Sequence, residues 1–271
     1  MSYKFKCIVL LFLIYSMCTF GSELIFLDNS VTNDTYIASN KENQIKIAFK
    51  LGVDDLKTKY PNCEIVSKVQ VSRSDLLDIF KQADKIKSTS KKTFLVGLIH
   101  SSEALLAGKA LQKTNVLALS SGAATVKLNN INNNFFSLAN TTVKVASLIK
   151  QYTDKLKLRK VGVVYPGNSM FSRELVDEFS KKYESLSFSI AVDTLNLKEI
   201  DKKSLMEADA VFVPGFIQQT LPIIKYLSEA GYNGIIIGSP NLARSKNDLD
   251  TYLKFLTLKR TKLHFVASWI E

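Results

Sequence analysis

The stretch TFLVGLIHSSEALLAGKALQKTNVLALSSGAAT, residues 93–125, decides the fold class. It opens with TFLVGLIH (93–100), which is apolar on both faces, as expected of a strand in the centre of a parallel sheet. Ser101 and Ser102 can cap a following helix, and NVLALS (115–120) then forms the next strand. The stretch therefore predicts a strand, a helix and a second strand of an α/β protein.

The same alternation runs outward from this stretch in both directions. Further strands are expected at 23–28, 63–71, 135–140, 160–165, 187–195, 210–216, 234–239 and 263–270. Helices are expected near 42–59, after Ser74, and at 142–155, 171–184, 217–230 and 247–258. The first of these would place Ile45, Ala48, Leu51 and Leu56 on one face.

The predicted elements form two consecutive series of about 120 residues each, which fit two lobes better than one very wide sheet. We therefore expect an N-terminal α/β lobe over 22–142 and a C-terminal α/β lobe over 143–271.

The first 21 residues have the order of a secretory signal. Lys4 and Lys6 precede the apolar run CIVLLFLIYSMCTF, and the small residues Thr19 and Gly21 follow it. The run of about 14 residues is shorter than the roughly 20 needed to cross a bilayer, so cleavage is favoured over an uncleaved anchor. We expect export to the periplasm or the cell exterior; lipid anchoring through Cys18 is the less favoured alternative.

Composition excludes several classes of protein. The chain has 271 residues, 46% of them apolar, which is enough for a large core. Its net charge of +11 permits contact with anionic partners, but the lysine-rich runs lack interleaved aromatic residues, so no nucleic-acid partner is expected. Three cysteines and two histidines do not suggest a metal site, and the usual phosphate-loop, dinucleotide, zinc-protease and esterase motifs are absent from the sequence. We expect no cofactor, no metal and no enzymatic activity.

Small hydroxyl residues follow two neighbouring predicted strands. Ser101 and Ser102 come after 93–100, and a turn containing Ser121 and Thr125 comes after 115–120. Ligands in open α/β sheets settle at the carboxyl ends of strands, where helix N-termini favour anions. The two turns could together hold a carboxylate, although simple helix capping remains the alternative for each.

The order of segments resembles the type I periplasmic binding proteins, the leucine-binding or branched-chain amino acid binding family of ABC transporters. The stretches that carry the resemblance are 94–125, FFSLANTTVKVASLIKQY (135–152), KVGVVYPGNSMFSRELVDEF (160–179) and 208–240. The resemblance implies two Rossmann-like lobes with parallel central sheets and a ligand cleft between them. It also implies a small-molecule ligand, an ABC permease as partner, and a monomer. The family continues past the position of Glu271, so the chain is expected to lack the second-lobe return segment.

The resemblance assigns roles to individual positions. Ser101 or Ser102 would bond the carboxylate of the ligand, and the turn after the next strand would complete that site with a backbone N–H and a hydroxyl. One aromatic wall would follow each of two second-lobe strands. The ligand-binding residues implied are Ser101, Ser102, Ser121, Ala123, Ala124, Thr125, Phe171 and Phe216.

Two functions remain open at this stage. The first is an exported solute-binding protein that captures a small polar or anionic, amino-acid-like ligand for an importer. Amino acid binders of the family have an acidic residue where this chain has Pro240 and Asn241, so another small molecule is also an option. The alternative function is an envelope sensor or scaffold with a degenerate cleft that acts through protein contacts.

Overall fold

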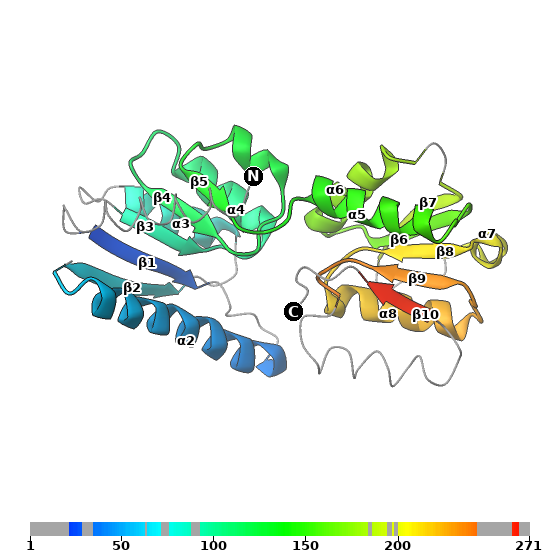
Figure 1. The fold of residues 1–271 in the computed structure, drawn as a ribbon, viewed down its shortest axis with the longest axis horizontal. Helices are drawn as coiled ribbons and strands as arrows, with labels where there is room; N and C mark the ends of the chain where they lie inside the picture. Colours follow the sequence, from blue (N-terminus) through cyan, green and yellow to red (C-terminus); the bar gives the residue numbers. More distant parts are fainter. Residues whose placement is uncertain are drawn as a thin grey trace. The chain divides into compact units, whose positions relative to one another are not determined.

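The computed structural model describes residues 22–28, 35–62, 64–71, 76–87, 93–183, 186–193, 197, 200–242 and 262–265 (Figure 1). By its contacts the chain divides into two compact units, one ending at Ala139 and the other starting at Asn140. The predicted lobe boundary lies three residues later, at 142/143. The predicted signal peptide (1–21) and the helix expected at 247–258 lie outside the described residues.

The first unit contains one five-stranded sheet in the order β2-β1-β3-β4-β5, with every neighbouring pair parallel. Its strands are β1 (Ser22–Asp28), β2 (Ile65–Val71), β3 (Thr93–Gly97), β4 (Leu117–Ser120) and β5 (Phe135–Ser137). Its helices are α2 (Thr35–Lys59), α3 (Leu76–Lys87), α4 (Ser101–Ala110) and the 3₁₀ helix η1 (Val126–Asn130).

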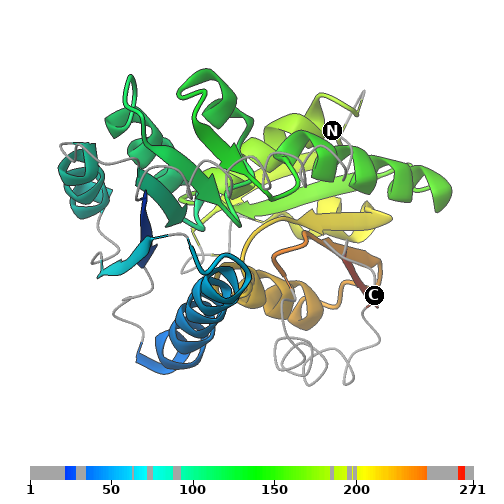
Figure 2. The same ribbon diagram turned by 60° about the vertical axis from the view of Figure 1, so that its left-hand side comes forward.

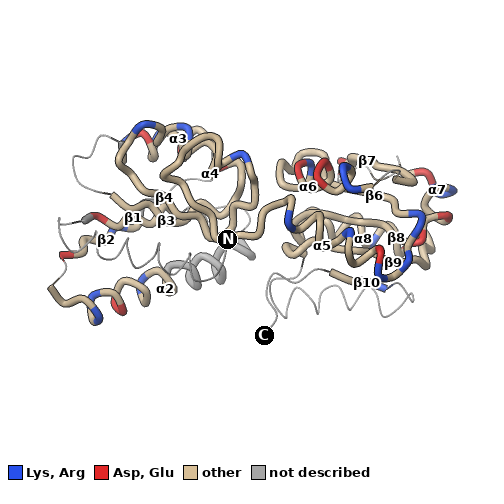
Figure 3. The backbone as a smooth tube through the Cα atoms, turned by 45° about the horizontal axis from the view of Figure 1, so that its top comes forward, with Lys and Arg blue, Asp and Glu red and all other residues tan. Residues whose placement is uncertain are grey.

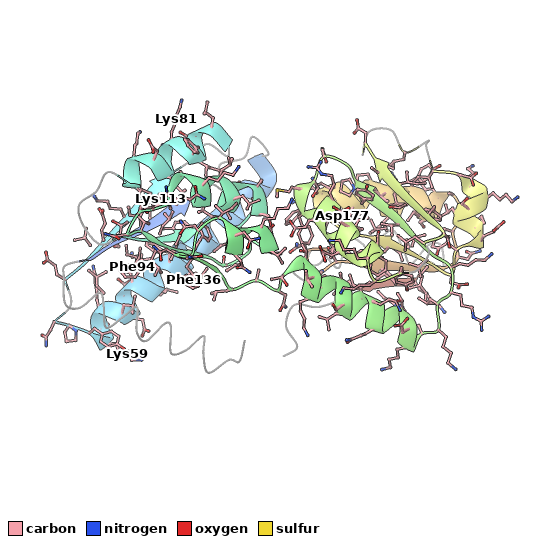
Figure 4. The ribbon with its side chains drawn as sticks, turned by 90° about the horizontal axis from the view of Figure 1, so that it is seen from above. Lys59, Lys81, Phe94, Lys113, Phe136 and Asp177 are labelled. Atoms are coloured by element: carbon pink, nitrogen blue, oxygen red, sulfur yellow. The ribbon has the colours of Figure 1, made fainter. Side chains whose placement is uncertain are left out.

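The helices of the first unit cover opposite faces of its sheet. On one face, Ile79 of α3 and Ala107 of α4 share a buried cluster with Leu95 of β3. On the other face, Val53 of α2 packs in a separate cluster with Phe94 of β3. Figure 4 shows this separation through its labelled side chains, because Lys59 in α2 and Lys81 in α3 lie on opposite sides of the strands. Parallel strands covered in this way bury apolar side chains on both faces, which explains the continuous apolar run of β3.

The inward face of α2 differs from the one predicted. Leu51 was expected in the core but is 63% exposed, while Val53 is buried and Phe49 packs beside it. The Phe49 ring stacks on Phe26 of β1 with centroids 5.1 Å apart. The helix is thus turned so that Phe49, Val53 and Leu56 face the sheet, a spacing that also satisfies the helical period.

The second unit repeats the architecture (Figure 2). Its sheet has the order β10-β9-β8-β6-β7, again with every neighbouring pair parallel. The strands are β6 (Val161–Pro166), β7 (Phe188–Val192), β8 (Ala210–Val213), β9 (Ile235–Gly238) and β10 (Lys262–Phe265). The helices are α5 (Thr142–Lys155), α6 (Met170–Ser180), α7 (Lys202–Glu207) and α8 (Ile217–Glu229). Of these helices, the short α7 was not predicted.

Buried aromatic groups hold this sheet between its helices. The Phe179 ring of α6 lies 4.9 Å from the Phe212 ring of β8, centroid to centroid. On the α8 side, the fully buried Tyr232 donates a hydrogen bond from its hydroxyl to the carbonyl of Ala208, at 3.1 Å. Burial raises the pKa of this phenol far above its ordinary value, so the hydroxyl stays a donor at physiological pH.

The Asp209 carboxylate holds the two residues that precede β6, at the edge of the sheet opposite the strand C-termini. Asp209 accepts the backbone N–H groups of Lys160, at 2.9 Å, and Arg159, at 2.8 Å. These hydrogen bonds lower the pKa of Asp209 below its ordinary value, because they favour the charged form.

The predicted fold class is confirmed: the chain is an α/β protein with two sets of five parallel strands, each flanked by helices. None of the helices that the structure describes combines the length and the apolar character needed to cross a membrane.

Candidate functional site

The connection from β3 to α4 leaves the strand through two residues with positive φ. Gly97 has φ +120° and Leu98 has φ +56°. A Cβ atom at Gly97 would lie 2.5 Å from the carbonyl oxygen of Leu27 on the neighbouring strand, so only glycine fits this approach. Leu98 keeps its left-handed conformation because its side chain is buried, at 1% exposure. The connection is therefore fixed, and it sets where α4 begins.

Ser101 and Ser102 are the first two residues of α4. The expectation that they cap the helix is wrong, since the N-cap is His100, whose backbone N–H donates to the Glu103 carboxylate at 3.4 Å. Ser101 is buried and Ser102 half-buried. Neither hydroxyl has a hydrogen-bond partner among the residues that the structure describes. Both hydroxyls thus lie at a helix N-terminus and remain available to another group.

Ser120, the last residue of β4, joins two turns. Its buried hydroxyl donates to the carbonyl of Leu98 at 2.7 Å. The same oxygen accepts the N–H groups of Ala123 at 2.9 Å and Gly122 at 3.3 Å. The Ser120 side chain thereby connects the turn after β4 to the turn after β3 by hydrogen bonds.

The two turns are also in close backbone contact. A Cβ atom at Gly122 would lie 2.7 Å from the carbonyl oxygen of Ile99 and 2.6 Å from its Cγ2 atom. The absence of a side chain at Gly122 lets the two turns touch. The sequence-predicted residues on both turns are therefore neighbours within the first unit.

The remaining predicted residues of the second turn differ in what they offer. Ser121 is exposed, while Ala123, Ala124 and Thr125 are buried. The N–H of Ala123 is already used by Ser120, so this residue does not supply the backbone donor. Thr125 caps η1, where its hydroxyl oxygen accepts the N–H of Lys127 at 3.2 Å.

Two backbone donors in this turn stay unused. The N–H groups of Ala124 and Thr125 donate to no acceptor in the described part of the chain. Together with the hydroxyls of Ser101 and Ser102, they give four hydrogen-bond donors on two touching turns. Residues 93–102 and 114–126 carry no Lys, Arg, Asp or Glu, so these turns are tan in Figure 3. Such a set of neutral donors beside a helix N-terminus suits a carboxylate.

The second unit has its own pair of joined turns at strand C-termini. Gly215 follows β8 and Ser239 follows β9. The Gly215 N–H donates to the Ser239 hydroxyl oxygen at 3.2 Å, and that hydroxyl donates to the Gly215 carbonyl at 3.1 Å. Gly215 has φ +153°, and a Cβ there would lie 2.8 Å from Thr220 Cγ2. This pairing fixes the start of α8.

The two predicted aromatic residues lie side by side in this unit. Phe216 is the N-cap of α8 and is half-buried, whereas Phe171, near the start of α6, is only 6% exposed. Their ring centroids are 5.6 Å apart, with the rings tilted by 48°. Phe171 therefore supports the Phe216 ring from the core side.

The sequence analysis did not assign a role to the serines that build these turns. Ser120, Ser137 and Ser239 each bond backbone groups; Ser137 donates to the carbonyl of Ala123 at 2.5 Å. A signal was available for Ser120, because it continues the inward face that Ala118 marks on β4. Ser239 lies too far along the chain from Gly215 for any local pattern to reveal their bond.

Titratable groups do not form a reactive cluster here. His100 is exposed at the start of α4, and His264 of β10 bonds the Tyr152 hydroxyl through Nδ1 at 2.6 Å. Across the described ranges, no three His, Cys, Asp or Glu residues are grouped to hold a metal ion.

No protein-family model matches the sequence, and no curated protein is significantly similar to it. Solved structures, in contrast, resemble the fold. The branched-chain amino acid transporter substrate-binding protein LivJ of Streptococcus pneumoniae, in complex with isoleucine, aligns at TM-score 0.69 and 15% identity over 90% of this chain and 70% of LivJ.

Two further structures extend the comparison. An ABC transporter substrate-binding protein of Desulfitobacterium hafniense, in complex with Leu, gives TM-score 0.64 and 11% identity over 80% of this chain and 65% of its own. A solute-binding protein of an ABC transporter from R. palustris, in complex with benzoate, gives TM-score 0.65 and 15% identity over 82% and 63%. The chain thus spans less than two thirds of these two proteins.

The resemblance of fold that the sequence suggested is confirmed by these structures. The chain has the type I periplasmic binding protein fold, the fold of the substrate-binding proteins of ABC transporters.

Proposed function

We propose that this protein is an exported solute-binding protein that holds a small carboxylate ligand in a cleft between its two units and delivers it to the permease of an ABC importer. The observation that carries the proposal is the set of unused donors on the turns after β3 and β4: the hydroxyls of Ser101 and Ser102 and the N–H groups of Ala124 and Thr125. Similarity of fold to ABC substrate-binding proteins supports it.

Unused donors at these positions favour an external acceptor. The two serine hydroxyls are not among the buried side-chain atoms that lack a partner, so water can reach them and a ligand can replace that water. A carboxylate could accept all four donors through its two oxygens, and hydrogen bonds to a charged acceptor are about twice as strong as neutral ones. The fixed geometry of Gly97 and Ser120 would hold the donors in place before the ligand arrives.

The segment that connects the two units starts and ends at the carboxyl ends of strands. β5 ends at Ser137 and α5 starts at Thr142, next to the start of α6, because Thr142 bonds Glu174 at 2.8 Å. Residues 138–141 therefore link the carboxyl end of one sheet to the carboxyl end of the other.

The proposed role is binding without chemistry. His100 precedes Ser101 but its side chain is exposed, and the Nδ1 atom of His264 is bonded to the Tyr152 hydroxyl. The apolar N-terminal run supports export to the periplasm or cell exterior. We also propose that the protein is a monomer.

Replacing Ser102 by alanine should weaken ligand binding about tenfold while leaving the ligand-free melting temperature unchanged. The hydroxyl has no partner among the described residues, so its removal costs the folded protein little, but it removes one hydrogen bond to a charged group. Thermal melts with a panel of small carboxylates measure both effects, since a hundredfold excess over Kd stabilises by about 2.7 kcal/mol.

Ser67→Ala, which removes an exposed serine of β2, is the matched control and should change neither quantity. A variant Ser102→Ala that loses stability without ligand and keeps its ligand response would assign the hydroxyl to helix capping. A flat response of the unaltered protein to the whole panel would contradict the proposal and favour an envelope scaffold that acts through protein contacts.

A further inference from the structure

The connection between α5 and β6 is strongly basic. It has the sequence KLKLRK (155–160), which runs from the last residue of α5 to the residue before β6. Four of these six residues are basic. The side chains of Lys155, Lys157, Arg159 and Lys160 are all exposed, and Figure 3 draws such residues in blue.

The end of α6 adds further lysines beside this connection. Lys181 and Lys182 directly follow the helix. The ends of α5 and α6 are neighbours, because the Tyr183 hydroxyl donates to the Thr153 hydroxyl and the Lys150 ammonium lies 4.9 Å from the centroid of the Tyr183 ring. We call the resulting surface the basic edge. It comprises Lys155, Leu156, Lys157, Arg159, Lys160 and Lys182.

The acidic residues at this end of the unit are already engaged. Three of them form ion pairs: Asp154 with Lys150 at 2.5 Å, Glu178 with Lys181 at 2.6 Å and Glu207 with Lys160 at 3.5 Å. Asp209 accepts the backbone N–H groups of Arg159 and Lys160, and its charge balances part of theirs. In the described part of the chain, four cations of the basic edge have no ion pair: Lys155, Lys157, Arg159 and Lys182.

Lys157 occupies a backbone conformation that favours glycine. Its φ is +56°, and α5 is closed by hydrogen bonds from the N–H groups of Lys157 and Leu158 to the carbonyls of Asp154, at 2.9 Å, and Thr153, at 3.0 Å. The same pair of bonds closes α8, where the equivalent residue is Gly231 with φ +85°. A cation favours a helix C-terminus, but Lys155 already supplies one. The local fold therefore does not explain a lysine at position 157.

We propose that the basic edge is a surface that docks on an anionic lipid bilayer. Basic segments near anionic lipids gain affinity with each Lys or Arg that reaches the headgroups. Leu156, which is 38% exposed between Lys155 and Lys157, can enter the interface while the lysine ammonium groups stay at the headgroups.

The composition of the basic edge favours a lipid surface over other anionic partners. Three of its four unpaired cations are lysines, which act as point charges and suit a diffuse anionic surface. Recognition of a single carboxylate or phosphate would favour the two-pronged guanidinium of arginine. Residues 153–160 contain no aromatic side chain on which the bases of a nucleic acid could stack.

This inference does not depend on the proposed function. The basic edge lies where β6 starts, and it contains none of the residues assigned to ligand binding. Docking on lipid and binding of a solute can therefore fail or succeed separately.

Binding to vesicles tests the proposal. The full chain should sediment with vesicles that contain phosphatidylglycerol but not with vesicles of phosphatidylcholine alone. Raising the salt from about 0.1 M to about 1 M should release it, because the Debye length falls from about 10 Å to about 3 Å. Lys155→Gln, Lys157→Gln and Arg159→Gln combined should weaken binding about a hundredfold, at about fivefold for each charge.

A second triple variant is the matched control. Lys81, Lys109 and Lys113 are exposed lysines of the first unit, and their combined replacement by glutamine changes the net charge by the same amount. This control should bind the anionic vesicles like the unaltered protein. All variants carry the same apolar N-terminal run, so any binding through that run is equal among them and is measured on the neutral vesicles.

Two single variants separate the surface role from a structural one. Lys157→Gly should raise the melting temperature, because glycine fits the positive φ, and still weaken vesicle binding about fivefold. Leu156→Ser should weaken binding to the vesicles several-fold without changing binding to dextran sulfate, a soluble polyanion with no apolar phase.

Three results would overturn the proposal. The first is that the unaltered protein binds anionic and neutral vesicles equally. The second is an equal loss of binding in the two triple variants, which would assign binding to the overall charge. The third is a Leu156→Ser variant that binds vesicles as tightly as the unaltered protein, together with equal affinity for dextran sulfate and for vesicles; this result would assign the basic edge to a soluble polyanion.

Discussion

Gly97→Ala is expected to lower the free energy of unfolding by about 3 kcal/mol or more, the largest effect of any substitution proposed for this protein. Two independent penalties act at this position. The backbone has φ +120°, which side chains of L-residues rarely adopt, and the new Cβ would lie 2.5 Å from the Leu27 carbonyl oxygen. That oxygen belongs to β1, which is paired on both sides by β2 and β3, so it cannot move away without disturbing the sheet.

Two other glycines separate the penalties. Gly231 has φ +85° but nothing within 4 Å of its Cβ position, so Gly231→Ala should cost only the conformational term of about 1 kcal/mol. Gly52, inside α2, has neither strain nor contact, so Gly52→Ala should stabilise the protein by up to about 1 kcal/mol. Urea denaturation of the three variants measures the series. A Gly97→Ala variant as stable as Gly231→Ala would show that the β3 to α4 connection is not fixed by this contact.

Ser120→Ala is expected to cost about 2 to 4 kcal/mol of stability and to abolish most ligand binding. Its hydroxyl is fully buried and bonds three backbone groups on two turns. Alanine would leave the Leu98 carbonyl and the Ala123 N–H without their partner, and each unsatisfied buried group costs about 1 to 3 kcal/mol. The turns would also lose the bond that holds them together, which displaces the unused N–H donors of Ala124 and Thr125.

The neighbouring Ser121 provides the control for this experiment. Ser121 is exposed, and Ser121→Ala should change stability by no more than about 0.5 kcal/mol. Chemical denaturation and ligand-induced melting shifts measured on both variants give the comparison. Equal stabilities for the two variants would mean that Ser120 does not join the turns.

The spacing of apolar residues along the sequence was sufficient to predict the strands. The run 93–100 is apolar on both faces because α2 and α4 cover the two faces of β3, and the structure places β3 at the centre of its sheet. The same criterion failed for the orientation of α2. Apolar residues occur on more than one side of this helix, and Ile47 and Leu51 remain exposed, so the period alone did not identify the inward face.

The candidate site was predicted in part. The pattern of serines after strands correctly placed Ser101, Ser102 and the turn that contains Thr125 on neighbouring turns, because the carboxyl ends of adjacent parallel strands lie at one edge. Ligand binding by these residues stays a prediction. The pattern could not distinguish the hydroxyl groups that form hydrogen bonds within the protein from those that stay available to a ligand. That division depends on contacts between residues far apart in sequence, such as the bond from Ser120 to Leu98.

Aromatic residues show the same limit. Phe171 lies in α6 and Phe216 is the N-cap of α8, and the sequence pattern alone did not distinguish a role in the wall of a ligand site from a role in the core for either residue. The structure distinguishes them, because Phe171 is buried beneath Phe216 while Phe216 keeps part of its ring accessible. Of the two rings, only Phe216 is therefore accessible in part to a group outside the protein core.

A crystal structure of the protein with its tightest-binding carboxylate tests the central claim most directly. The account predicts the ligand carboxylate within about 3 Å of the hydroxyl of Ser101 or Ser102 and of the N–H groups of Ala124 and Thr125. A carboxylate bound elsewhere, or these four donors occupied by the protein's own side chains, would contradict it.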